Sequence, residues 1–302
     1  MAAVTLAVHP GALGDVLLAV PALRALKAAA PAPLALAAQP HIAALLESLA
    51  IVDRGLAFES LGLDALFVED PSGRARLPEL ARLVCWFGAR DEIFVRRLRA
   101  IVADAVVAPS VGEGATVWRH LLETVGAPPG EWCAPVTVAG ALRAEGAKAL
   151  AEAGGEGPPP WLFVHPGAGS PGKCWPAEAF AQVITTLAAS TRVNVVVHAG
   201  PADAAAAAAL RRHLGAGVAW LTNPSLPVLA GVLAHATVYL GNDSGVSHLA
   251  AALGVPSLIL FDARHLAWRP WWPGAHARTV TLTRTEPEDV RAVIAGLGTM
   301  LR

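Results

Sequence analysis

The segment 241–261, with the sequence GNDSGVSHLAAALGVPSLILF, constrains the fold more than any other part of the chain. A turn of small polar residues opens an apolar helix, and this helix leads directly into an apolar strand. At the start of such a helix the backbone N–H groups have no partner within the helix, and the helix dipole adds partial positive charge there. The pattern is typical of an anion site in an α/β protein, and it indicates a phosphate ligand.

The residues of this turn have two interpretations. Asp243 or Ser244 could cap the helix while Gly245 eases the turn, and residue chemistry alone favours that structural interpretation. His248 changes the balance, because its helical spacing from Ser244 places both side chains on the same side of the helix start. A buried histidine with its own partner is the alternative for His248. The leading hypothesis is a substrate that carries a diphosphate.

An internal echo indicates how the chain is organised. LAVHPGA at 6–12 returns as LFVHPGA at 162–168, and in both places an apolar strand breaks into a Pro-Gly loop. Between the two copies, GGEGPPP at 154–160 is too rich in Gly and Pro to continue a helix or strand. A length of 302 residues suits two domains of ordinary size. We therefore expect two domains, 1–154 and 155–302.

Composition excludes several classes of protein. Hydrophobic residues make up 54% of the chain, but much of the excess is alanine, and no apolar run approaches the roughly 20 residues needed to cross a bilayer. The start lacks the basic region and cleavage pattern of a signal peptide. The net charge of -1 gives no field that would attract nucleic acid, and the three cysteines lack the spacing of zinc or disulfide frameworks. We expect a cytoplasmic protein with no nucleic-acid partner and free thiols.

Strands and helices alternate along the predicted chain. Strands are predicted at 4–9, 34–37, 64–68, 104–107, 161–165, 193–198, 237–240 and 256–261. Helices are predicted at 15–29, 41–49, 77–87, 91–100, 115–126, 176–189, 202–213, 226–235, 246–253 and from 287 onward. Repeated β-α units predict an α/β fold with parallel sheets covered on both faces and ligands at the carboxyl ends of the strands. Two such domains would form a cleft between them.

Two further loops carry candidate chemistry. In GALGD at 11–15, the glycines permit close backbone approach to a ligand, and the helix dipole keeps Asp15 ionised, so that this carboxylate could accept a proton from an attacking hydroxyl. Helix capping explains Asp15 equally well. In HPGAGSPGKCWP at 165–176, Lys173 stands just before a helix and could balance phosphate charge, the alternative being a solvated surface lysine.

Three motifs together resemble one enzyme family. GALGDVLLAVPALRALK, HPGAGSPGKCWPAEAF and GNDSGVSHLAAALG, in this order, resemble the bacterial heptosyltransferases of glycosyltransferase family 9. The resemblance implies a GT-B fold, in which two Rossmann-like domains face each other across a cleft, with an acceptor-side domain at 1–154 and a nucleotide-sugar-binding domain at 155–302. It implies inverting, metal-independent transfer of a sugar, heptose by default, from a nucleotide-diphosphate sugar to an envelope glycan or glycolipid acceptor. An ADP-sugar is the favoured donor, and no cofactor is required.

The resemblance also implies roles for individual residues. By motif position, Asp15 resembles the catalytic base that removes the proton of the acceptor hydroxyl. The residues that would bind the donor and its phosphates are Gly14, Gly167, Lys173, Asp243, Ser244, Gly245 and His248. The assignment is physically coherent, because the leaving nucleoside diphosphate gains negative charge that a lysine and a helix N-terminus stabilise.

Some segments depart from the family pattern. Phe261 is followed by Asp262, Ala263 and Arg264, where the family commonly has a Phe-Gly turn and a small hydroxyl residue, and this leaves the sugar open. Residues 50–150 match little of the family.

Within that middle section, basic residues suggest an acceptor side. Arg90 and Arg96 belong to a cluster that would fit an anionic acceptor, and His120 is a further acceptor-side candidate. The alternative, favoured by composition, is a helix whose charged face is solvated and balanced by Asp91 and Glu92.

A tryptophan-rich segment at 264–278 contains Trp268, Trp271 and Trp272. We expect it to line the cleft or to pack between domains rather than to contact a membrane, because prolines stiffen it and no amphipathic helix accompanies it. At most, the protein would touch the inner face of the cytoplasmic membrane peripherally.

Two other functions compete with glycosyl transfer. A non-catalytic module that binds sugar nucleotides would keep the phosphate loops without a working acceptor site. A nucleotide-dependent oxidoreductase is disfavoured, because no GxGxxG follows the first strand.

Overall fold

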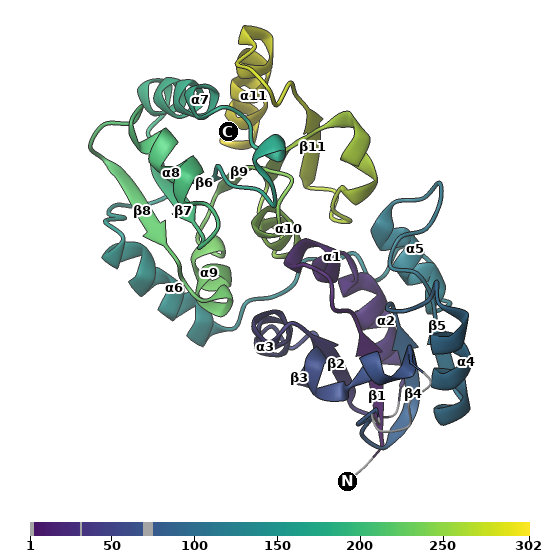
Figure 1. Cartoon of the computed structure of the whole chain (residues 1–302). Coiled ribbons are helices and arrows are strands. Elements are labelled where there is room, and N and C mark those ends of the chain that lie inside the picture. The colour runs from purple at the N-terminus through teal and green to yellow at the C-terminus, as the bar shows by residue number, and fades with distance from the viewer. Residues whose placement is uncertain (1–2, 31, 69–74) are drawn as a thin grey trace. The chain divides into compact units, whose positions relative to one another are not determined.

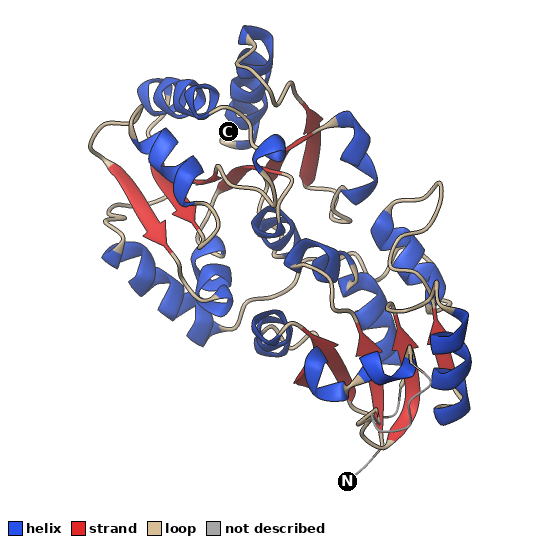
Figure 2. Ribbon diagram, viewed as in Figure 1, coloured by secondary structure: helices blue, strands red, loops and turns tan. Residues whose placement is uncertain are grey.

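The computed structural model describes residues 3–30, 32–68 and 75–302. The chain forms two compact units, Met1–Cys133 and Ala134–Arg302, and each unit has its own sheet (Figure 1, Figure 2). All the strand pairs described in both sheets are parallel. Every residue of β2 (Leu34–Ala38) and β6 (Trp161–His165) is buried, so both faces of each sheet are covered.

The first unit is built on a five-stranded sheet of order β3-β2-β1-β4-β5. Its other elements are β1 (Val4–Val8), α1 (Leu13–Leu18), α2 (Val20–Ala29), α3 (Pro40–Ser48), β3 (Arg54–Ala57), η1 (Phe58–Leu61), η2 (Leu63–Leu66), β4 (Leu80–Cys85), α4 (Glu92–Ile101), β5 (Ala105–Val107) and α5 (Val117–Thr124). Leu6, Val8 and Cys85 of the central strands pack with Phe94 and Leu98 of α4 in its core.

The second unit is built on a six-stranded sheet of order β11-β10-β9-β6-β7-β8. Its other elements are α6 (Gly140–Glu152), η3 (Pro171–Lys173), α7 (Ala177–Ser190), β7 (Asn194–Ala199), α8 (Ala204–Arg211), β8 (Val218–Thr222), α9 (Leu226–Leu233), β9 (Val238–Asn242), α10 (Gly245–Ala252), β10 (Ser257–Phe261), η4 (Ala263–Trp268), β11 (Ala275–Thr279) and α11 (Pro287–Met300). Phe180 and Ile184 of α7 pack with Val293 and Leu297 of α11 in the core of this unit.

The boundary between the units lies earlier than the Gly-Pro run at 154–160. Helix α6 precedes that run but packs on α9 of the second unit, at a crossing made by two glycines. A Cβ added to Gly146 would lie 2.0 Å from the backbone carbon of Gly231, so the two helix backbones are in direct contact. The Gly-Pro run is therefore the turn that leads from α6 into β6, and the two compact units meet between residues 133 and 134, whereas the sequence predicted a border at 154 and 155.

Two predicted elements of the first unit differ in type. The segment 77–87, predicted as a helix, contains strand β4, which pairs in parallel with β1 on one side and β5 on the other. A central position covered on both faces overrides the helical spacing of its leucines. The segment 64–68, predicted as a strand, lies largely in the 3-10 helix η2. The helix predicted at 15–29 is divided into α1 and α2 at Ala19, just before Pro21.

None of the helices that the structure describes combines the length and the apolar character needed to cross a bilayer.

Candidate active site

The order of strands identifies one switch point in each sheet. In the second unit β6 and β9 are neighbours, and the chain leaves β6 toward β7 but returns on the other side as β9. In the first unit the same reversal occurs between β1 and β4. Ligands of doubly wound sheets bind at the carboxyl ends of the strands at such points. The loops after β6 and β9, and those after β1 and β4, are therefore the candidate binding loops.

Asn242, the last residue of β9, joins the two loops at the switch point of the second unit. Its side-chain oxygen accepts a hydrogen bond from the backbone N–H of Trp175 at 3.0 Å. Its side-chain nitrogen donates to the carbonyl oxygen of Pro166 at 2.8 Å. Asn242 is fully buried. The loop that carries Lys173 is thus held against the start of α10 by one amide side chain.

The start of α10 shows how its small polar residues are used. Ser244 is the N-cap, and its hydroxyl accepts a hydrogen bond from the backbone N–H of Ser247 at 3.3 Å. Beneath it, the hydroxyls of Ser247 and Tyr239 are 2.8 Å apart. The capping interpretation therefore holds for Ser244. Capping leaves the helix dipole directed at the turn that contains Gly245, the first residue of α10.

Asp243 is the centre of a triad with Lys173 and His248. Lys173 Nζ lies 2.9 Å from Asp243 Oδ2, and His248 Nε2 lies 3.5 Å from Asp243 Oδ1. Burial acts to raise the pKa of Asp243, but the hydrogen bonds from His248 and Lys173 outweigh it and hold the pKa below the usual value. The side chain of Lys173 is one third exposed, whereas the other two side chains are almost fully buried. Lys173 is therefore positioned by a fixed carboxylate and can still reach a ligand.

His248 has one nitrogen committed to Asp243. Its other nitrogen, Nδ1, is buried without a hydrogen-bond partner among the described residues. A buried polar atom of this kind is costly unless a ligand or water completes it. The structure thus brings together Lys173, Asp243, Ser244, Gly245 and His248.

Gly167 has a packing role that the sequence did not indicate. A Cβ at this position would lie 1.9 Å from Asp203 Oδ1. The glycine therefore makes room for a carboxylate from the next loop, instead of only permitting close approach of a ligand. Gly14 lies within α1, directly before Asp15.

Asp15 lies in the first turn of α1, and the N-cap residue of this helix, Ala12, offers no side-chain cap. Gly11 separates Asp15 from His9, because a Cβ on Gly11 would lie 2.8 Å from the His9 ring and 3.2 Å from Asp15 Cβ. Burial lowers the pKa of His9 to about 4, although the nearby charge of Asp15 acts in the opposite direction. A neutral imidazole thus lies beside the candidate base.

A cavity of about 610 Å³ lies at the carboxyl ends of β4 and β5, beside the switch point of the first unit. Its lining comes from the segments that follow β4 and β5, together with Phe67. Trp86 and Phe87 supply aromatic walls, and Arg90 and Asp91 supply charge. A concave site with aromatic walls and a few charged groups is a candidate ligand site in the first unit.

The other acceptor-side candidates lie elsewhere. Arg96 is exposed on α4 and does not line the cavity. His120 Nε2 donates a hydrogen bond to the carbonyl oxygen of Pro109 at 2.9 Å, and its ring packs under Gly112. His120 therefore supports a loop that reaches the cavity through Pro109.

Within the tryptophan-rich segment, Trp272 packs on glycines of the second unit. Trp271 is buried, and the ring of Trp272 covers Gly274. At the start of the segment, Arg264 forms a two-point ion pair with Asp262, at 2.9 and 2.8 Å, and these hydrogen bonds hold the pKa of Asp262 below the usual range. The residues that depart from the family pattern thus form a local turn of their own.

Sequence reasoning missed several residues of these sites. His9 and His165 occupy the same position of the repeated strand-loop unit, so the echo itself carried that signal. His198 and Asp203 lie beside His165. Burial is the main cause that lowers the pKa of His198 to about 3, and the neighbouring imidazole of His165 lowers it further. Asn242 was quoted only as part of the turn, because its amide contacts depend on a loop far away in the sequence.

The comparison with protein families places the chain. The model of glycosyltransferase family 9 (heptosyltransferase) matches residues 100–292, well over half of the sequence. The chain therefore belongs to glycosyltransferase family 9, and the resemblance drawn from the three motifs is confirmed. The matched range covers the second and third motifs, while the GALGD loop lies outside it.

The more particular similarities are to lipopolysaccharide heptosyltransferases. The chain is 31% identical over 135 residues to lipopolysaccharide heptosyltransferase 3 of Escherichia coli K12, a match that covers 40% of this chain and 38% of that protein. A solved family 9 glycosyl transferase from Veillonella parvula has a TM-score of 0.74 at 17% identity and covers 98% of this chain and 96% of its own. ADP-heptose lipopolysaccharide heptosyltransferase II of E. coli has a TM-score of 0.74 at 18% identity, covering 99% and 98%. These structural matches confirm the predicted α/β fold of the GT-B type, with two Rossmann-like parallel-sheet domains.

Proposed function

We propose that this protein transfers a sugar, an ADP-activated heptose by default, to an envelope glycan or glycolipid acceptor with inversion at the anomeric carbon. The observation that supports this most is the Lys173–Asp243–His248 triad at the start of α10. A fixed, partly exposed ammonium group beside a helix N-terminus is a suitable site for a diphosphate. E. coli heptosyltransferase WaaC, whose structure has a TM-score of 0.69 to this chain at 18% identity, has been solved with ADP.

In the proposed reaction Asp15 acts as general base. Its carboxylate takes the proton of the acceptor hydroxyl while the hydroxyl oxygen forms a bond to the anomeric carbon of the donor. The bond from that carbon to the diphosphate oxygen breaks on the opposite face, and the electron pair leaves with the nucleoside diphosphate. Lys173 and the N-terminus of α10 stabilise the charge that develops on the leaving group.

The two units would divide the work. The second unit would hold the nucleotide sugar, because it contains the triad and the start of α10. The first unit would hold the acceptor in the cavity lined by Trp86, Phe87 and Arg90, beside the switch point where α1 carries Asp15 in its first turn. An anionic acceptor would meet Arg90 there. The proposal also includes a cytoplasmic location, with at most peripheral contact with the membrane.

The donor base is tested by binding. Calorimetric titration of the protein with ADP, UDP, GDP, CMP and NAD, each with and without magnesium, should give one preferred nucleoside diphosphate whose affinity does not change with the metal. Preference for NAD, or no binding of any nucleotide, would contradict the donor site.

The catalytic role is tested at Asp15. Changing Asp15→Asn keeps the size of the side chain but removes the base, so turnover should fall about 100- to 10,000-fold while the affinity for the preferred nucleoside diphosphate stays the same. Release of nucleoside diphosphate from the donor in the presence of acceptor measures the rate. A non-catalytic binding module would show no turnover in the unaltered protein, and near-normal turnover of the variant would show that the base is another group.

A further inference from the structure

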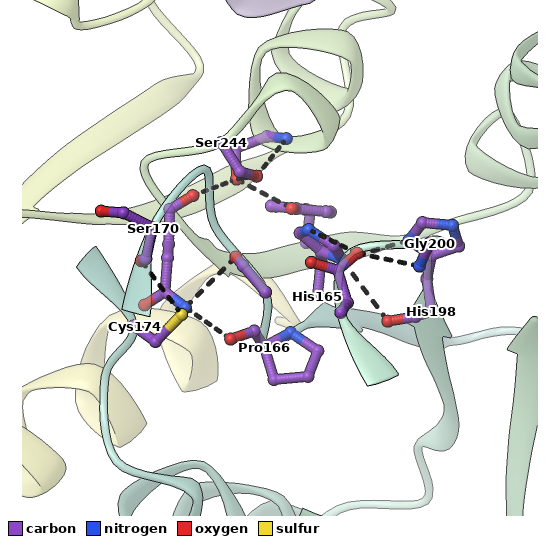
Figure 3. Close-up of polar contacts among 12 residues, drawn as sticks. His165, Pro166, Ser170, Cys174, His198, Gly200 and Ser244 are labelled. Atoms are coloured by element: carbon purple, nitrogen blue, oxygen red, sulfur yellow. Dashed lines mark hydrogen bonds and ion pairs between the residues drawn. The ribbon is translucent and has the colours of Figure 1, made fainter. Parts of the chain in front are cut away.

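Two histidines and an aspartate form a cluster that the proposed transfer does not use. Val164 of β6 pairs in register with Val197 of β7, so the residues that follow, His165 and His198, lie side by side at the strand ends (Figure 3). Both imidazoles are almost fully buried, at 2% and 3% exposure. Asp203, the residue before α8, brings its carboxylate to the same place, and one ligand atom from each of the three residues lies within 4.8 Å of the others.

The position of the carboxylate determines which nitrogen of His165 is available. Asp203 Oδ2 accepts a hydrogen bond from the backbone N–H of Gly200 at 2.8 Å and lies 3.8 Å from His165 Nε2. A carboxylate on that side favours the tautomer of His165 that carries its proton on Nε2. The lone pair of His165 is then on Nδ1. That atom lies 3.1 Å from His198 Nδ1 and 3.4 Å from the carbonyl oxygen of His198.

We propose that these groups bind a divalent transition-metal ion of the zinc class, with His165 Nδ1, His198 Nδ1 and the His198 carbonyl oxygen as ligands. Two imidazole nitrogens that each lie about 2.0–2.1 Å from a tetrahedral zinc are about 3.4 Å apart, close to the separation observed here. Asp203 is then the carboxylate behind a metal-bound histidine, which fixes the tautomer and raises the basicity of the ligand.

Gly167 provides an independent indication that the position of the Asp203 carboxylate is constrained by its surroundings. A side chain at this position would displace the carboxylate, because its Cβ would lie 1.9 Å from Asp203 Oδ1. The ion would tie the β6 loop, which continues to Lys173, to the β7 loop that contains Gly200. It would be a structural site, separate from the triad, and is compatible with sugar transfer that needs no metal at the donor.

The test is metal binding to the whole protein, without any measurement of transfer. After dialysis against a chelator and desalting, titration with Zn²⁺ should give one site per chain, and Zn²⁺ should raise the Tm. Changing Asp203→Asn should weaken zinc binding about 10- to 100-fold, since it removes the carboxylate behind the ligand. Changing His198→Gln should remove the site and with it the rise in Tm. His213→Gln, which alters an exposed histidine of the same unit, should leave both unchanged.

A shared proton is the competing occupant, since His198 Nδ1–H could donate directly to His165 Nδ1. In that case the unaltered protein would bind less than one zinc per chain, or the His198→Gln variant would bind as tightly as the unaltered protein, and either result overturns the proposal. The stoichiometry of the unaltered protein decides the question even if the variants do not fold.

Discussion

At the scale of single residues, the candidate donor site depends on how the cost of burying one carboxylate, that of Asp243, is offset by its neighbours. Asp243 is buried, and a buried carboxylate stays ionised only where cations and hydrogen bonds oppose the cost of burial. Lys173 and His248 both contact the Asp243 carboxylate, and these contacts also fix the orientation of their own side chains. A ligand phosphate would meet a lysine whose side chain is already ordered, which reduces the entropy lost on binding.

We expect Lys173→Ala to weaken binding of the preferred nucleoside diphosphate about 10- to 100-fold, because a charge-assisted contact of about 1.5–3 kcal/mol is removed. Calorimetric titration measures the affinity. Lys148→Ala is the matched control, since that lysine is largely exposed on α6 and should leave affinity unchanged. Equal affinities of the Lys173 variant and the unaltered protein would show that the ammonium group does not contact the phosphates.

His9 predicts a loss of stability in acid. Burial lowers its pKa in the folded protein to about 4, whereas an unfolded histidine titrates near 6.5. Between these values the unfolded chain binds the extra proton, so the free energy of unfolding should decrease as pH falls from about 6.5 to 4, by up to about 3 kcal/mol from this residue. Urea unfolding at pH 7 and pH 4.5 measures it, and His9→Gln should lose less stability between the two pH values than the unaltered protein. An identical loss in both would assign the acid sensitivity to other groups.

At the scale of elements, the predicted ranges agree best with the structure for elements that are apolar on all sides. Buried strands β1, β2, β6 and β10 and their helices follow the expected ranges within a few residues. The strands β3, β8 and β11 escaped prediction because each lies at the edge of its sheet, where only part of the strand is buried. The three motif loops could be predicted because each is local in sequence. The Asn242 contacts and the cavity could not, since they depend on pairings between distant segments.

The crossing of α6 and α9 gives a prediction about two glycines of one helix. Gly146→Ala should destabilise the protein by about 1–3 kcal/mol, because its Cβ would lie 2.0 Å from backbone carbon of Gly231. Gly140→Ala, at the start of the same helix, meets nothing within 4 Å and should be neutral or slightly stabilising, since alanine favours helix over glycine. Thermal unfolding of both variants measures the effect. The crossing would be looser than described if both substitutions raised the Tm.

At the scale of the whole molecule, α6 belongs to the unit that follows it, although the Gly-Pro run separates it from that unit in sequence. The second unit therefore begins near Ala134, and it contains the candidate binding loops after β6 and β9 and the triad. This makes the unit a candidate for independent folding, because its sheet and its core are formed from its own residues.

We expect a fragment of residues 134–302 to unfold cooperatively and to bind the preferred nucleoside diphosphate. A fragment of residues 155–302 should be less stable or aggregate, because it lacks α6 and exposes the face of α9 that α6 covers. Denaturant unfolding and calorimetric titration of the two fragments provide the comparison. Equal stability of the fragments would return the border to the Gly-Pro run.

Asn242 has a consequence for motion. Its amide holds the N–H of Trp175 and the carbonyl of Pro166 at the same time, so neither loop at the switch point can shift without breaking a buried hydrogen bond. The loop with Lys173 and the start of α10 should thus respond to a nucleotide as one rigid body. Amide hydrogen exchange would then slow or quicken in both loops together, and the hinge for any rearrangement would lie outside them.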